Sequence, residues 1–255
     1  ETKQMCIYGL GEMHIDVITS KLKNRFGTTV TISPAKVPYR ETIKKKVQVE
    51  GKHKKQSGGH GQYGHVKIEF SPGTTDGLEF TETIFGGSVP KNFHPAVEKG
   101  LQESMAKGVL AGYPVIGIKA NLFDGSYHDV DSSEMSFKLA ANLAFKEGMK
   151  QGGAVLLEPV GELRVSIPTS YSGDIMGDIS KRRGRIMGMS ESGRKGFTVI
   201  EAEVPSAEMG TYAIQLRAMT QGRGSYSFNF VRYEEAPAEV AAKVIEAAKK
   251  EAAVE

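Results

Sequence analysis

The sequence has few of the residues on which disulfide, zinc or membrane chemistry depends. Of its 255 residues one is a cysteine, Cys6, which excludes an intramolecular disulfide and a multi-cysteine zinc site. No apolar run approaches the roughly 20 residues that a membrane-spanning helix needs. Residues 1–5 also lack the basic segment and apolar stretch of a secretion signal. We therefore expect a cytoplasmic protein without a membrane partner and without redox chemistry.

An excess of charge of one sign is also missing, although the basic residues are clustered. The net charge of +3 is too small to indicate a nucleic-acid partner by itself. Residues 44–55 nevertheless hold six lysines and one glutamate, and residues 181–185 hold four basic residues and no acid. Such clusters bind phosphate by displacing its counterions, but a solvated basic face explains them equally well.

The length predicts two domains and part of a third. Residues 5–8 are typical of a short buried strand, residues 11–26 of an amphipathic helix that Gly27 ends, and residues 28–32 of a second strand. This β-α-β order is half of a two-layer unit. We therefore expect the chain to begin within a domain, with a linker over residues 34–38.

Residues 39–157 predict a second unit of mixed helices and strands. A lysine-rich strand over residues 44–49 and an alternating strand over residues 65–70 flank a glycine-rich loop. Pro95 suits the first turn of a helix with Val97, Leu101 and Met105 in one apolar stripe. A strand over residues 114–123 and a turn at Asp124-Gly125 complete the central part of this unit.

A second helix of this unit should follow Asp131. Asp131 and Glu134 have the spacing of a capping box, which predicts that Asp131 caps the helix. Met135, Leu139 and Leu143 then form its buried face.

The third unit repeats a strand and helix pattern in the order βαββαβ. Leu163, Val165 and Ile167 alternate with polar residues, so one face of the sheet should be buried under two helices. A ferredoxin-like sandwich fits this order, and residues 237–255 predict a helical tail. The expected elements are strand 162–167, helix 172–181, strands 185–189 and 197–204, helix 206–220 and strand 225–233.

Two glycine patterns imitate nucleotide-binding motifs. Residues 59–64 satisfy G-x-G-x-x-G, but a polar segment precedes them and an alternating strand follows, so no helix N-terminus can hold a phosphate. Residues 188–195 have the glycine spacing of a P-loop without its lysine and hydroxyl residue. We therefore expect no nucleotide binding and no catalytic residues in this chain. The three histidines near the glycine loop lack a metal-site spacing, and we expect no metal there.

The glycine loop is better suited to RNA. Its four glycines allow close backbone approach, residues 52–55 supply cations, and Tyr63 supplies a stacking surface. Residues 125–129 combine small, aromatic and imidazole groups in the same way. Two such loops at one end of a domain would form a probing tip, although an ordinary flexible hairpin is the alternative for the first of them.

The longer motifs make the sequence similar to a known family. Residues 56–66 (QSGGHGQYGHV), 126–133 (SYHDVDSS) and 177–184 (GDISKRRG) together resemble bacterial-type elongation factor G, the translocation GTPase of the ribosome. Residues 9–14, 37–42 and 157–159 resemble its third domain and the entries to its fourth and fifth domains. The resemblance covers nearly the whole chain.

The resemblance implies a multidomain α+β chain. Residues 1–36 would be part of domain III, a partial ferredoxin-like unit, and residues 37–156 domain IV. Domain IV would have a ribosomal-protein-S5-domain-2-like fold with a left-handed βαβ crossover, against the general handedness rule. Residues 157–236 would be the ferredoxin-like domain V, and residues 237–255 the tail. The GTPase domain would be absent, so that GTP and Mg²⁺ belong to the intact factor and this chain needs no cofactor.

The resemblance also implies a mechanical role in translocation. Domain IV would insert its tip into the ribosomal A site against tRNA and mRNA, while domain V would face rRNA, and the factor would act as a monomer. The alternatives are a ribosome-recycling or ribosomal-protection paralogue, or a stand-alone RNA-binding module. His60 stands where the family commonly has arginine, which should weaken phosphate binding because histidine is half protonated only near pH ~6.5. The expected RNA-binding residues are Ser57, Gly58, Gly59, His60, Gly61, Gln62, Tyr63, His128, Asp129, Lys181, Arg182, Arg183 and Arg185.

Overall fold

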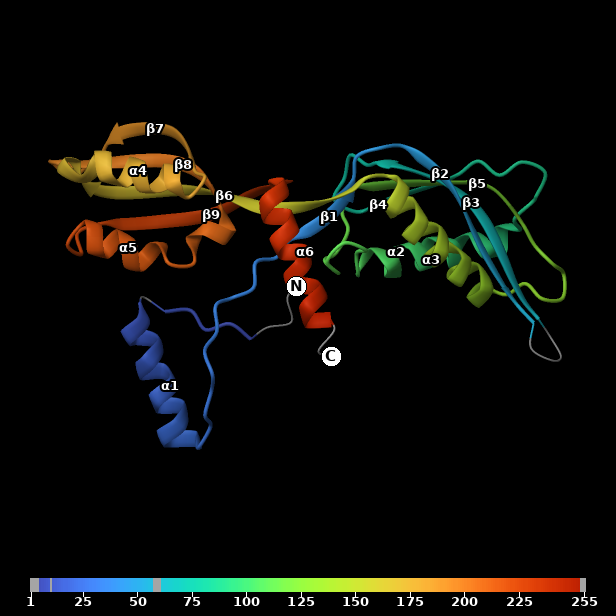
Figure 1. Cartoon of the computed structure of the whole chain (residues 1–255), viewed down its shortest axis with the longest axis horizontal. Coiled ribbons are helices and arrows are strands. Elements are labelled where there is room, and N and C mark those ends of the chain that lie inside the picture. The colour runs from blue at the N-terminus through green and yellow to red at the C-terminus, as the bar shows by residue number, and fades with distance from the viewer. Residues whose placement is uncertain (1–4, 10, 57–60, 253–255) are drawn as a thin grey trace. The chain divides into compact units, whose positions relative to one another are not determined.

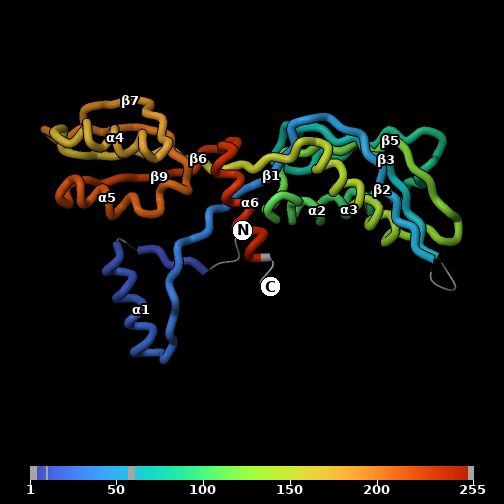
Figure 2. The backbone as a smooth tube through the Cα atoms, viewed as in Figure 1, coloured from blue at the N-terminus to red at the C-terminus, as the bar shows by residue number. Residues whose placement is uncertain are grey.

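The computed structural model describes residues 5–9, 11–56 and 61–252 of the chain (Figures 1 and 2). The chain divides into two compact units, and each is described by itself. The first unit comprises residues 1–38 and 158–234. The second comprises residues 39–157 and 235–255. The mixed α+β class expected from the sequence is confirmed by the helices and sheets of both units.

The N-terminal segment forms the expected helix but not the expected strands. Helix α1 (Glu12–Phe26) ends at Gly27, whose φ of 65° is the left-handed conformation that favours glycine. Among residues 5–9 and 11–38 the structure has no strand, so the strands expected at 5–8 and 28–32 are wrong. A strand exists only through hydrogen bonds to a neighbouring strand, and none of the described strands pairs with these segments.

The second unit is built on a four-stranded sheet in the order β2-β3-β5-β4. Its hairpin pairs β2 with β3 in antiparallel register, with Val47 opposite Phe70 and Lys55 opposite Gln62. Strands β4 and β5 are parallel and are joined through helix α2, whereas the handedness of this crossover stays a prediction. The bounds are β1 (Arg40–Ile43), β2 (Val47–Lys55), β3 (Gln62–Pro72), β4 (Leu78–Glu82), η1 (Lys91–Phe93), α2 (His94–Met105), β5 (Ile118–Ser126) and α3 (Glu134–Gln151).

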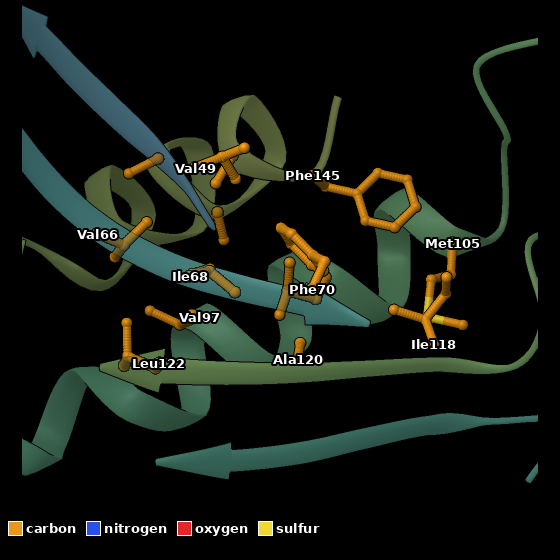
Figure 3. Close-up of a cluster of buried hydrophobic side chains, with 14 of the residues drawn as sticks. Val49, Val66, Ile68, Phe70, Val97, Met105, Ile118, Ala120, Leu122 and Phe145 are labelled. Atoms are coloured by element: carbon orange, nitrogen blue, oxygen red, sulfur yellow. The ribbon is translucent and has the colours of Figure 1, made fainter. Parts of the chain in front are cut away.

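One face of this sheet packs against α2 and α3 (Figure 1). The buried cluster combines alternate residues of β3 with the stripe of α2, as Figure 3 shows for Val66, Ile68 and Phe70. The predicted stripe of α2 is confirmed, because Val97, Leu101 and Met105 are all buried in this cluster. The expected turn at Asp124-Gly125 is wrong, because both residues lie within β5.

Two expectations for α3 are corrected. The cap is Ser133, whose side chain accepts a hydrogen bond from the Ser136 amide, and not Asp131. Met135 is 58% exposed and Leu143 is 44% exposed, so the expected buried face points away from the core. The shift follows from the small residues of the helix, which allow it to lie close to β2 and β3. Its buried face consists of Ser136, Phe137, Ala140, Ala141, Ala144, Phe145, Gly148 and Met149.

The first unit contains the predicted βαββαβ fold. Its strands are ordered β7-β8-β6 with β9 on the other side of β6, the order of a ferredoxin-like sheet. Inward residues of β6 and β8 pack against α4 and α5 in one buried cluster. The helix expected over residues 206–220 is divided into a short 3-10 turn and α5. The bounds are β6 (Ala154–Pro168), η2 (Thr169–Tyr171), α4 (Ser172–Lys181), β7 (Arg185–Glu191), β8 (Phe197–Pro205), η3 (Ser206–Met209), α5 (Tyr212–Met219) and β9 (Ser225–Glu235).

The chain continues after β9 into helix α6 (Ala238–Ala252), as expected for the tail. Strand β1 pairs with the first residues of β6, with Arg40 opposite Leu157, and thereby closes the second unit. Within the described part of the chain, none of the helices is both long and apolar enough to cross a membrane.

Candidate nucleic-acid interface

The two loops that sequence analysis selected meet at one end of the second unit. The Gly61 amide donates a 2.9 Å hydrogen bond to Asp131 Oδ1, and the Tyr63 amide donates one of 2.8 Å to the Asp131 carbonyl. Ser132 Oγ in turn donates a 2.9 Å bond to the Tyr63 carbonyl. These bonds join the end of the β2–β3 hairpin to the segment between β5 and α3. We call residues 61–63 and 126–132 the tip.

Asp131 and Ser132 therefore hold the candidate site together, a role that sequence analysis missed. Asp131 does not cap α3, because its carboxylate and carbonyl both bind the hairpin 68 to 70 residues earlier in the chain. No local signal in the sequence reveals a partner so distant. The SYHDVDSS motif marks the segment as unusual, but it does not identify which of its polar groups contact the hairpin.

The tip presents aromatic and polar groups to solvent. The rings of Tyr63 and His128 meet edge to face, with centroids 4.5 Å apart and planes at 61°. The His128 backbone is held on both sides, because its amide donates to Ser132 Oγ at 2.9 Å and its carbonyl accepts from the Ser132 amide at 3.0 Å. Asp129 and Gln62 are also exposed. A fixed backbone with exposed polar side chains suits recognition of a surface by shape and hydrogen bonding.

Two glycines allow the hairpin to lie directly on α3. A Cβ at Gly51 would lie 2.1 Å from the Ala140 carbonyl oxygen, and a Cβ at Gly64 would lie 2.3 Å from that of Ser136. Real Cβ atoms do not approach backbone atoms so closely. The hairpin is therefore held by backbone contact with α3, which gives the tip a rigid base.

Lysines lie next to the tip, which itself contains Asp129 and Asp131. The Lys52 ammonium lies 5.9 Å from the Tyr63 ring centroid, and Lys54 and Lys55 are exposed on the same strand. Farther from the tip, Lys67 and Asp124 form a 2.8 Å ion pair, and the hydrogen bond from Lys67 is the largest of the interactions that lower the Asp124 pKa to about 2. Lys67 is thus neutralised by a neighbour, whereas Lys54 and Lys55 project into solvent and suit phosphate.

The candidates Ser57, Gly58, Gly59 and His60 lie outside the described residues. Gly61 and Tyr63 lie in the tip, as do His128 and Asp129. Gln62 Oε1 is 2.9 Å from His53 Nε2, so this pair ties the two strands of the hairpin together. The structure therefore brings together the described members of the tip prediction.

The basic cluster of the first unit differs from what a phosphate site requires. Arg182 is 8% exposed, and its guanidinium bonds to Asp178 at 2.8 Å and also to the Glu208 carbonyl and Gln215. The guanidinium also lies over the Tyr212 ring, 5.1 Å from its centroid, in a cation–π contact. The Arg182 guanidinium is buried and bonded within the fold, so the geometry argues against a phosphate contact by this residue.

Arg183 is also engaged within the fold. Its guanidinium binds Glu158 through two hydrogen bonds of 2.7 and 2.9 Å and Glu208 Oε1 through one of 3.0 Å. The hydrogen bond to Glu158 is the largest interaction that raises the Arg183 pKa. Lys181 and Arg185 are exposed, and Arg185 binds Glu203. The prediction of rRNA contacts is therefore narrowed to Lys181 and Arg185.

Comparison with known proteins places these features in a family. Models of elongation factor G match successive parts of the chain: domain III at residues 1–34, domain IV at residues 35–153 and the C-terminus at residues 155–244. An elongation factor G-like protein of Thermotoga maritima is 50% identical over 252 residues, which are 98% of this chain and 37% of the relative.

A solved structure agrees with this match. A crystal structure of a protein from Thermus thermophilus has a TM-score of 0.85 and 43% sequence identity, over 95% of this chain and 36% of that chain. The chain thus spans little more than a third of the length of these two relatives. The chain belongs to the elongation factor G family, of which it comprises sequence from domain III, domain IV and the C-terminus.

Proposed function

We propose that this chain is the ribosome-binding C-terminal arm of an elongation factor G-like GTPase. In this proposal, the tip enters the A site on the decoding side and holds tRNA and mRNA while they move. The observation that carries it is the bonded junction of two loops through Asp131, which brings Tyr63 of the hairpin against His128 of the segment between β5 and α3. The family membership supports a role in translation.

The role of the tip in this proposal is mechanical. Gln62, His128 and Asp129 offer exposed donors and acceptors for nucleotide edges and sugars, and the Tyr63 and His128 rings offer stacking surfaces. Lys54 and Lys55 bind phosphate, which positions the arm without reading sequence. Lys181 and Arg185 of the first unit would contact rRNA. GTP hydrolysis would be performed by the intact factor and not by these residues.

Co-sedimentation with 70S ribosomes at two salt concentrations tests the proposal. Lys54→Ala together with Lys55→Ala should reduce the salt slope of the binding constant by about two units, because about one phosphate contact is lost per lysine. Lys150→Ala on the exposed side of α3 is the matched control and should leave the slope unchanged. His128→Ala should weaken binding because it removes an exposed ring and its hydrogen-bonding groups.

An intact elongation factor G should displace the chain from the ribosome. Displacement by the factor, with the expected slope change, supports the proposal. Binding to free structured RNA without preference for ribosomes would contradict it and favour a stand-alone RNA-binding module. An intact factor that carries this arm would distinguish a translocase from a recycling factor. A translocase moves tRNA and mRNA, whereas a recycling factor separates the ribosomal subunits.

A further inference from the structure

A half-buried histidine lies directly behind the tip. The His65 side chain is 12% exposed, and its Nδ1 lies 2.7 Å from Ser126 Oγ. The same Ser126 oxygen lies 2.7 Å from Tyr63 Oη. On the other side of the ring, His65 Nε2 lies 2.9 Å from Glu50 Oε1, but this contact lacks hydrogen-bond geometry and is an electrostatic one. Glu50, His65, Ser126 and Tyr63 therefore form one continuous series of polar contacts, which we call the relay.

The chemistry of these groups determines where the protons lie. The carboxylate close to Nε2 favours the neutral tautomer with its proton on Nε2, because a nitrogen lone pair at this position would be repelled by the negative charge. His65 Nδ1 then accepts a hydrogen bond, and the Ser126 hydroxyl is the donor at 2.7 Å. Because a hydroxyl has one hydrogen, Ser126 can only accept from Tyr63. The Tyr63 hydroxyl therefore donates to Ser126.

The relay ends on the aromatic pair of the tip. Its bond to Ser126 fixes the outer end of the Tyr63 ring, and the edge-to-face contact passes this orientation to His128. Neither Ser126 Oγ nor the His65 ring is fully exposed, so the bonds of the relay are protected from competition by water. The positions of the partly exposed Tyr63 ring and the exposed His128 ring thus depend on the Ser126 and His65 side chains.

The surroundings of His65 favour the neutral ring. Burial is the largest influence and lowers the His65 pKa. Glu50 on β2 and Asp124 on β5 raise the pKa, whereas Lys52 on β2 and Lys67 on β3 lower it. The net direction is downward from 6.5, so the relay has the proton arrangement described above at neutral pH.

We propose that His65 and Ser126 are positioning residues for RNA binding, which hold Tyr63 and through it His128 in the orientation that the tip requires. The functional part of this statement rests on the proposed function of the tip, but the relay itself does not. Protonation of His65 reverses the first bond of the relay: Nδ1 then donates to Ser126, so the Ser126 hydrogen leaves Nδ1 and the surroundings of the Tyr63 hydroxyl change. A side chain that only fills space would not transmit this change.

NMR titration of the whole 255-residue chain tests the relay. The ring signals of Tyr63 and His128 are followed from about pH 8 to about pH 5, the range in which histidines titrate. The Tyr63 signals should show a step at the His65 midpoint. Ser126→Ala should remove this step, and Ser126→Thr should restore it because threonine keeps the hydroxyl. His94, whose Nε2 is 3.0 Å from the Val89 carbonyl oxygen, is an internal reference for folding, because its ring signals should be unchanged in a folded variant.

A binding experiment provides a second test. Ser126→Ala and Tyr63→Phe should each weaken ribosome binding about fivefold, the loss expected for one hydrogen bond. The double variant should bind no more weakly than either single variant, because both changes break the same relay. Multiplied losses, or a Tyr63 step that persists in Ser126→Ala, would overturn the proposal. If the unaltered chain fails to bind ribosomes, the proposed function fails, whereas the NMR result still decides the relay.

Discussion

The close approach of the hairpin to α3 makes a strong prediction for Gly64→Ala. The new Cβ would lie 2.3 Å from the Ser136 carbonyl oxygen and 2.9 Å from the Phe137 amide nitrogen. Both atoms belong to the first turn of α3, so they cannot rotate away as a flexible side chain could. Overpacking costs about 1–3 kcal/mol in general, and we expect the upper end, about 3 kcal/mol, because backbone must move.

The assay is urea and thermal unfolding of the variant, monitored by circular dichroism. A loss of about 3 kcal/mol should lower the melting temperature of a unit of this size by about 10 °C. Gly77→Ala is the matched control, since a Cβ at this exposed glycine of the same unit has nothing within 4 Å. If Gly64→Ala and Gly77→Ala are equally stable, the backbone contact does not restrict this position and the reasoning is wrong.

Three further predictions concern the first unit and use the same unfolding assay. Gly177→Ala inside α4 should raise stability by about 0.5–1 kcal/mol, because a Cβ there meets no atom within 4 Å and alanine favours the helix; a lower stability would contradict this. Arg183 and Gln221 both have positive φ, of 59° and 53°. Gln221→Gly should therefore be stabilising, whereas Arg183→Gly should lower stability by about 3 kcal/mol because it leaves buried Glu158 unpaired. A change of the same sign in both variants would refute this. Hydrogen bonds from Arg232 and then Arg185 lower the Glu203 pKa from 4.5 to about 2, so its contribution to stability is present above pH 4.5 and is lost as the pH falls through about 2. Over this pH window the free energy of unfolding should therefore fall less for Glu203→Gln than for the unaltered chain. Parallel curves of unfolding free energy against pH would contradict this role of Glu203.

Sequence patterns predicted the elements whose structure depends on local residues. The apolar spacing of α2 and the alternation in β6 both have periods that identify a helix and a strand, and both were confirmed. Helix α4 also has the predicted bounds, 172–181. The strands expected at 5–8 and 28–32 were wrong because strand formation depends on a pairing partner that apolar composition does not reveal.

Long-range contacts explain the remaining differences. The buried face of α3 was misassigned because glycines 51 and 64 on another element select small residues of the helix for contact. The Arg182 and Arg183 guanidinium groups bind partners as far as 33 residues away in the chain. The sequence of residues 181–185 does not reveal these partners, so all four basic residues were predicted to be available for phosphate. For the tip, the two loops could be predicted as a pair, but the role of Asp131 in joining them could not.

A tethered probe would test most directly whether the tip reaches the decoding region. In a Cys6→Ser background, Val130→Cys places a single thiol at the tip, where the native side chain is 70% exposed. Val109→Cys, in the segment between α2 and β5, is the control at a position that is 39% exposed. With iron attached to the thiol in ribosome complexes, the account predicts hydroxyl-radical cleavage of small-subunit rRNA at the decoding site from position 130 and not from position 109. Bound chain that gives no decoding-site cleavage from position 130 would contradict the account.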